Sequence, residues 1–161
     1  DKTKVFDHPL LTKFVPREIL DPVSRRRYTA PDEDYNHFNN ATVTAELRNL
    51  GVQVGIGAHG QREGLAAHWE LWMFEQGGMT PHQALEAGTM DGAKILGMAD
   101  EIGSIKEGKL ADLVILDADP LENLKNSEKV NMVMLNGRLY NAQTMDQLAP
   151  KEKKRPAFFF E

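Results

Sequence analysis

Apolar positions in the middle of the chain recur at helical spacing. The pair Asn39-Asn40 can cap a helix in which Val43, Leu47 and Leu50 fall at i, i+4 and i+7. Gly51 follows directly and ends the helix, as a glycine just past the last turn commonly does. The pattern is typical of an amphipathic helix.

The pattern changes immediately after this helix. Residues 52–57 form a short, β-branched apolar run bounded by glycines, which predicts a buried strand that presents His59 at its C-terminal end. A second helix is expected over residues 64–77. Its predicted core face consists of apolar side chains at i, i+4, i+7 and i+8, namely Leu65, Trp69, Trp72 and Met73.

Two further helices and a group of strands follow. The string Thr80-Pro81-His82-Gln83 combines a cap, a first-turn proline and a capping-box glutamine, so it predicts a helix over residues 81–88. Another is expected over 89–96. Apolar runs at 110–116 and 130–135 predict strands, and Asn136-Gly137 is the strongest short signal for a hairpin turn.

The ends of the chain are less regular. Residues 1–38 contain four prolines and no sustained period, so they predict an irregular arm with one short helix near 15–20, started by Pro16. The tail over 146–161 is basic and then aromatic. The first residues include no apolar stretch of the kind found in signal peptides and do not begin with methionine, so we expect the chain to be a piece of something longer.

Composition excludes several classes of protein. The 161 residues are 41% apolar, carry a net charge of −5 and include no cysteine. Disulfides, thiolate catalysis and cysteine-ligated metals are therefore excluded. The acidic balance argues against nucleic acid as a partner, because phosphate backbones are bound by cationic faces. No apolar stretch approaches the length of a membrane span.

Three strings in the second half resemble the metal-dependent amidohydrolase superfamily. The run from Gly103 to Val114 (GSIKEGKLADLV) is similar to the family's C-terminal signature, and residues 78–85 and 132–138 are similar to its flanking phrases. The glycines and the apolar residues of the signature have structural uses, turning the chain and filling a core. The strings therefore identify a lineage and carry no chemistry themselves.

The resemblance implies an α/β fold made of the C-terminal portion of a (β/α)8 amidohydrolase barrel and part of the small β-sandwich domain. Residues 39–102 would be the last β/α units of the barrel, and residues 103–145 the sandwich portion. The sequences of residues 57–61 and 67–72 are similar to those of an imidazolonepropionase-like branch of the family. In that branch the amidohydrolase domain follows a β-propeller in large bacterial proteins. That branch favours a periplasmic or secreted location over a cytoplasmic one.

Candidate site residues follow from the place of the last barrel strand. Members of the family commonly have a catalytic Asp at the C-terminal end of the last barrel strand, whereas this chain has His59 at that position. A neutral imidazole can accept a proton or bind a metal but supplies no negative charge. The resemblance makes His59 the catalytic candidate, with active-site rim or substrate-binding candidates at His37, Gly60, Gln61 and His68. A structural role is the alternative for each histidine.

Two functions remain open at this point. The chain belongs either to a divalent-metal hydrolase of C–N bonds, with zinc as the first choice, or to a degenerate binding or scaffolding domain that has lost its carboxylate. The expected substrate is a small molecule or a peptide-like compound. A barrel alone takes about 250 residues, so the chain by itself is expected to be inactive and to associate into oligomers through its unpaired edges.

Overall fold

The computed structural model describes residues 7–24, 30–58 and 64–161 of the chain. Two compact units can be distinguished. Unit 1 comprises the residues up to Tyr35 together with Pro156–Glu161, and unit 2 comprises Asn36–Arg155. The two units together contain helices and an antiparallel sheet, so the expected mixture of α and β elements is confirmed.

Unit 1 is more helical than its sequence suggested. Helix α1 (Pro9–Phe14) begins at a proline that follows the cap residue His8, whose Nδ1 accepts from the Leu11 amide at 3.4 Å. Helix α2 (Arg17–Ser24) begins just after Pro16, one or two residues beyond the expected start. A single 3₁₀ turn, η2 (Asp32–Asp34), follows. The same first-turn proline rule therefore accounts for both helices, although only the second was expected.

The aromatic tail takes part in the packing of unit 1. The ring of Phe158 lies 6.0 Å from that of Phe14 in an edge-on arrangement and 5.3 Å from that of Phe160 in a stacked one. Among the described residues of the unit, Leu11, Val15 and Leu20 are buried aliphatic side chains. Edge-to-face and offset aromatic pairs of this kind add to the burial of their apolar area.

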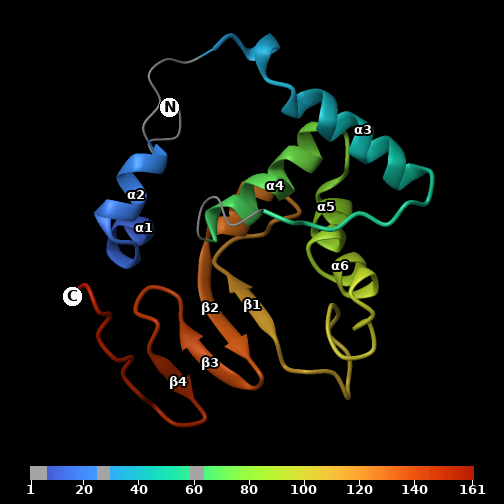
Figure 1. The fold of residues 1–161 in the computed structure, drawn as a ribbon. Coiled ribbons are helices and arrows are strands. Elements are labelled where there is room, and N and C mark those ends of the chain that lie inside the picture. The colour runs from blue at the N-terminus through green and yellow to red at the C-terminus, as the bar shows by residue number, and fades with distance from the viewer. Residues whose placement is uncertain (1–6, 25–29, 59–63) are drawn as a thin grey trace. The chain divides into compact units, whose positions relative to one another are not determined.

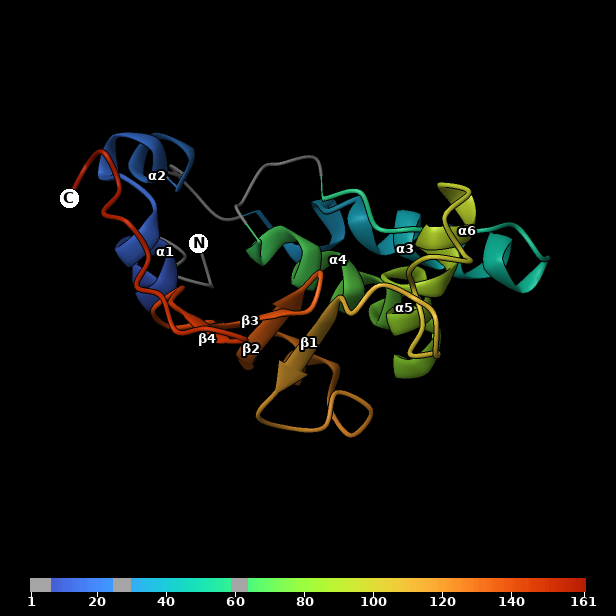
Figure 2. The same ribbon diagram turned by 90° about the horizontal axis from the view of Figure 1, so that it is seen from below.

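The described residues of unit 2 contain α-helices, a 3₁₀ helix and an antiparallel sheet (Figures 1 and 2). The helices are α3 (His37–Asn49), α4 (Leu65–Gln76), α5 (Pro81–Ala87) and α6 (Met90–Ile95). The predicted start of α5 is confirmed with both reciprocal hydrogen bonds of a capping box between Thr80 and Gln83. None of the helices in the described ranges is long and apolar enough to cross a membrane.

Helix α3 buries its small residues and exposes its large ones. Ala41 and Ala45 are buried, whereas Val43, Leu47 and Leu50, whose spacing predicted the helix, are exposed. The chain approaches Ala41 closely at Gly77, where an added Cβ would lie 2.2 Å from the Ala41 carbonyl oxygen.

Residues 52–57 do not form the predicted strand. The segment from Val52 to Ala58 is irregular in its hydrogen bonding and pairs with no strand of the described residues (Figure 1). Val52 is 49% exposed, while Val54 and Ile56 are partly buried against the core. A strand requires a neighbouring strand to accept and donate its backbone hydrogen bonds, and apolar sequence alone cannot supply one.

Helix α4 packs on more than one side. Its buried side chains are Leu65, Leu71 and Phe74, so of the predicted core face only Leu65 is fully buried, and Trp69, Trp72 and Met73 are half-buried. The core cluster is completed by residues of α3, of α5, of the connection between α4 and α5 and of the 3₁₀ helix η3 (Leu124–Glu128), namely Ala45, Met79, Ala84, Ala87 and Leu124. A helix that is apolar nearly all round is expected to be covered on several faces.

The sheet is an antiparallel meander in the order β1-β2-β3-β4. Its strands are β1 (Leu113–Leu116), β2 (Val130–Leu135), β3 (Arg138–Asn141) and β4 (Gln147–Ala149). The predicted second strand and the hairpin turn are confirmed, with φ of 48° at Asn136 and 74° at Gly137. Positive φ at both central residues is the geometry that makes Asn-Gly favourable there.

The first predicted strand begins three residues later than expected because its first residues serve the preceding turn. The Leu110 amide donates to the Glu101 carbonyl at 2.9 Å. Lys109 donates from Nζ to the carbonyls of Ala99 and Ile102, the latter at 3.0 Å. The Asp112 carboxylate accepts from the Asn136 amide at 2.6 Å and so holds the hairpin turn. The structural interpretation of the signature is therefore supported.

The approach at Gly77 generates a stability prediction. We expect Gly77→Ala to lower the free energy of unfolding by about 1–3 kcal/mol, because its Cβ would overlap backbone atoms of Ala41 that cannot move independently. Gly92→Ala is the matched control. Gly92 lies inside α6, and a Cβ added there would lie 3.4 Å from the Ala87 carbonyl oxygen, an ordinary contact. The substitution should therefore leave the free energy of unfolding unchanged or raise it by up to about 1 kcal/mol, as measured by urea denaturation. Equal effects of the two substitutions would contradict the close packing.

Candidate functional site

The end of the extended segment is held by one carboxylate. Glu70 of α4 accepts through Oε2 from the backbone amides of Gly57 and Ala58, at 2.7 Å each. Ala58 has a φ of 37°, a left-handed value that non-glycine residues seldom adopt. The chain therefore leaves this segment from a defined backbone position.

His59, Gly60 and Gln61 follow Ala58 directly in the sequence and lie outside the described residues. These are three of the five predicted site residues. The contact of Glu70 with the two preceding residues is the nearest structural information about them, and sequence reasoning did not single out Glu70 at all. Its only signal would have been an acidic residue amid the apolar positions of a helix.

The other two candidates lie on different helices. His37 is the first residue of α3, where its ring lies 4.0 Å from that of Phe38. His68 lies on α4, and its Nδ1 is 3.2 Å from the Ser127 hydroxyl. Among the described residues, no group of three or more His, Asp or Glu side chains could hold a metal ion.

His68 belongs to a small polar cluster between α4 and η3. The Trp72 indole donates to the Leu124 carbonyl and to the Ser127 hydroxyl, both at 3.1 Å, and Ser127 is buried. Burial lowers the pKa of His68 below its usual value, and the negative charge of Glu128 opposes this only in part. These contacts, made across more than fifty residues of sequence, give His68 a clear structural use.

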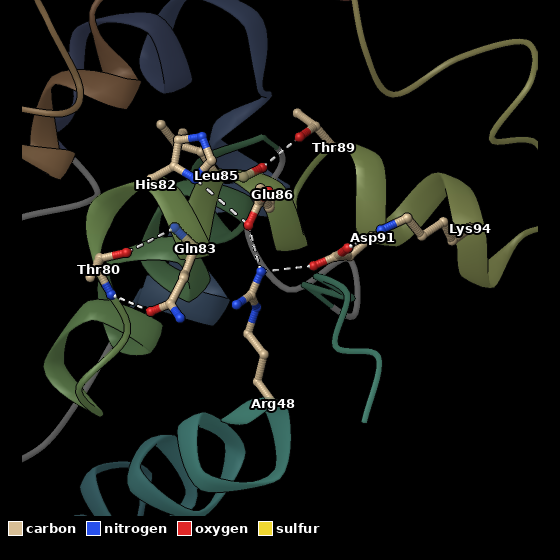
Figure 3. Close-up of polar contacts among 9 residues, drawn as sticks. All are labelled: Arg48, Thr80, His82, Gln83, Leu85, Glu86, Thr89, Asp91 and Lys94. Carbon is tan, nitrogen blue, oxygen red and sulfur yellow. Dashed lines mark hydrogen bonds and ion pairs between the residues drawn. The ribbon is translucent and has the colours of Figure 1, made fainter. Parts of the chain in front are cut away.

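A second polar cluster ties three helices together (Figure 3). Arg48 of α3 donates through Nη2 to Glu86 of α5 at 2.6 Å and to Asp91 of α6 at 3.1 Å. Lys94 donates to the other Asp91 oxygen at 3.0 Å. No local sequence motif predicts these ion pairs, because Glu86 and Asp91 lie 38 and 43 residues from Arg48 in the sequence.

The charges of this network control the ionisation of Asp91. Burial by itself raises the pKa of an aspartate, but the hydrogen bonds and positive charges of Lys94 and Arg48 outweigh it, so the pKa of Asp91 lies below its ordinary value. The carboxylate is only 13% exposed, and Arg48 is 16% exposed. The cluster is thus a partly buried ion-pair network with a role in joining the helices.

Comparison with known proteins identifies the lineage. Residues 33–140 match the Amidohydrolase family. The chain belongs to this family. Over 136 residues it is 32% identical to a 5-methylthioadenosine/S-adenosylhomocysteine deaminase of Desulforamulus reducens, an alignment that covers 68% of the chain and 30% of that protein. The predicted resemblance is therefore confirmed at the level of the family.

Two other amidohydrolase relatives extend the comparison. An imidazolonepropionase of Shouchella clausii is 46% identical over 55 residues, covering 34% of the chain and 12% of that protein. A solved structure of a Xaa-Pro dipeptidase with methionine in its active site is 25% identical, with a TM-score of 0.60 over 78% of this chain and 32% of that one. The chain thus spans about a third or less of the length of these relatives.

The ionisation of Asp91 predicts how stability depends on pH. A carboxylate whose pKa is depressed in the fold stabilises it above the unfolded pKa of 3.8, and this contribution is lost as the pH falls towards the lower folded value. We expect Asp91→Asn to destabilise the protein at pH 7 and the difference from wild type to shrink below about pH 4. The exposed Asp100→Asn is the control and should show no such dependence in denaturation measured from pH 7 to 2.5.

The lowered pKa of His68 predicts an effect in a different pH range. In the unfolded chain this histidine takes up a proton near its ordinary pKa of 6.5, whereas the folded chain resists the charge until a lower pH. Stability should therefore fall as the pH drops from about 7.5 through 6.5 towards the folded pKa. Denaturation of His68→Gln should show a flatter profile in this range. A slope as steep in His68→Gln as in wild type would refute the assignment.

Proposed function

We propose that the chain is the C-terminal part of a metal-dependent hydrolase that cleaves C–N bonds in amides, cyclic amides or peptide-like substrates. The observation that carries this proposal is the family match over residues 33–140. The names of the relatives support it, since they include a deaminase, an imidazolonepropionase and a dipeptidase.

Within this proposal the chain divides as the sequence suggested. Residues 39–102 would be the last β/α units of a (β/α)8 barrel, and 103–145 a portion of the small β-sandwich. Residues 1–38 would be an arm, and 146–161 a tail. The order of elements supports this division, because helices α3–α6 are followed by the antiparallel strands β1–β4. The contact of Val54 and Ile56 with the helical core supports an inner, strand-like place for residues 52–57 in a complete barrel.

His59 is the proposed catalytic residue, with Gly60 and Gln61 beside it in the chain and His37 at the rim of the site. His68 is the weakest of the candidates, because its bond to Ser127 supplies a structural reason for its presence. A divalent metal such as zinc would lower the pKa of a bound water in such an enzyme. The described residues include no group of three or more His, Asp or Glu side chains that could hold such a metal by themselves.

One observation favours a second function. His59 stands where the family resemblance leads us to expect Asp, and without a carboxylate the usual acceptor for the proton of the attacking water is missing. The domain would then bind a small molecule or peptide-like ligand without cleaving it, or act as a scaffold. The two functions differ in whether removal of His59 changes a chemical step.

The test is hydrolysis by the protein that contains this chain, with release of amine or ammonia measured from cyclic amides, dipeptides and aminated heterocycles. We expect His59→Ala to lower kcat by about 10²–10⁴-fold, the usual contribution of a positioned acid or base. His82→Ala is the control because its side chain is 69% exposed on α5. Dialysis against a chelator should abolish activity, and zinc should restore it.

Ligand binding without turnover, unaffected by His59→Ala and by the chelator, would establish the binding domain instead. The proposal also includes oligomer formation by the isolated chain and lack of activity on its own. The exposed side chains of Val43, Leu47 and Leu50 support it, as an apolar helix face of this kind favours association. A periplasmic or secreted location, with a β-propeller as a neighbouring domain, remains our expectation from the branch resemblance alone.

A further inference from the structure

The connection between β1 and β2 is attached to α4 by polar side chains. Helix η3 lies in this connection, and its Leu124 is buried in the core that α4 shares with the other helices. The Trp72 indole donates to the Leu124 carbonyl and to the Ser127 hydroxyl, and Nδ1 of His68 lies 3.2 Å from the same hydroxyl. His68 and Trp72 are one helical turn apart, so both reach η3 from the same face of α4.

The direction of each hydrogen bond in this cluster follows from what its groups can donate. An indole N–H can only donate, so the Ser127 oxygen accepts from Trp72. The Ser127 proton needs an acceptor of its own, because the residue is only 4% exposed and an unpaired buried hydroxyl is costly. Among the described residues, this hydroxyl bonds only with Trp72 and His68. The cluster is therefore satisfied when His68 is neutral, with its proton on Nε2 and with Nδ1 accepting from Ser127.

Protonation of His68 is incompatible with this arrangement. An imidazolium carries a proton on both nitrogens and can only donate, so Nδ1 can no longer accept from Ser127. The hydroxyl would lose the acceptor of its own proton, and a charge would appear on a half-buried ring. Among the described residues of the elements packed against α4, Glu128 of η3 is the charged group that acts on the ring, and it offsets the burial only in part. The contact between η3 and α4 therefore weakens as the pH falls.

We propose that His68 and Ser127 form a pH-sensitive contact that holds the β1–β2 connection against α4 while His68 is neutral and releases it when the ring is protonated. The opening is local, because the hairpin of β2 and β3 keeps its own backbone pairing. The helical part of unit 2 and its sheet would thus be joined less tightly at acidic pH. The inference does not depend on whether the chain hydrolyses C–N bonds.

Hydrogen exchange followed by mass spectrometry at pH 7.5 and pH 5.5 tests the inference on the protein that contains this chain. The uptake of each peptide is corrected for the intrinsic pH dependence of exchange. Peptides from residues 121–129 should lose protection by up to about 10-fold at the lower pH, because a histidine with its ordinary pKa of 6.5 in the opened state is mostly protonated there. Peptides from the hairpin over residues 130–141 should keep their protection.

Three variants identify the group that is responsible. His68→Asn keeps an amide oxygen that can accept from Ser127 but does not titrate, so protection of residues 121–129 should resemble wild type at pH 7.5 and should not fall at pH 5.5. His82→Asn is the matched control, because its side chain is exposed on α5, and it should keep the wild-type response. Glu128→Gln should move the response to lower pH, because the charge of Glu128 favours protonation of the ring.

A second measurement needs no folded His68→Asn variant. In ¹⁵N NMR of the histidine rings at pH 7.5, the His68 signal, assigned by its loss in His68→Gln, should show the proton on Nε2. A proton on Nδ1 would overturn the inference, because the ring would then donate to Ser127. Equal loss of protection in residues 121–129 and in the hairpin would indicate global unfolding, and a response that persists in His68→Asn would assign it to another group. Either result would also overturn the inference.

Discussion

The burial of helix α4 is the constraint on which the rest of unit 2 depends. Its apolar side chains contact α3, α5 and the 3₁₀ helix η3, and Leu71 and Phe74 lie in the shared core. The same helix contributes the polar contacts of Trp72 with η3 and of Glu70 with the extended segment. The connection between β1 and β2 is thereby attached to the helices, so one element joins the helical part to the sheet and binds the end of the extended segment.

What could be predicted from the sequence depended on how local the cause was. The capping box at Thr80 and Gln83 and the turn at Asn136-Gly137 are determined by residues within four positions of each other, and both are confirmed. The buried face of α3 depends on what packs against it: Ala41 is buried where the chain approaches at Gly77, whereas Val43, Leu47 and Leu50 are exposed. The prediction of a strand over residues 52–57 was wrong for a similar reason, because a strand forms only beside partner strands that the local sequence does not supply.

The candidate site shows the same division. A histidine after an apolar run can be recognised from sequence, but the carboxylate that binds the backbone before it cannot, because Glu70 lies 12 and 13 residues from the two amides that it binds and resembles any other glutamate on a helix. The bond between His68 and Ser127 spans 59 residues and converts a possible rim residue into one with a structural contact. Polar contacts between residues so far apart produce no periodic pattern in the sequence from which they could be predicted.

The residues that reveal the family and the residues that would carry its chemistry are different sets. Lys109 and Asp112 belong to the recognisable signature, and both bind backbone atoms: the lysine holds two carbonyls of the preceding turn, and the aspartate holds the hairpin at Asn136. Their geometry would serve a hydrolase and a catalytically inert relative equally well, because neither contact involves a substrate. Family membership therefore says little about whether His59 supports turnover.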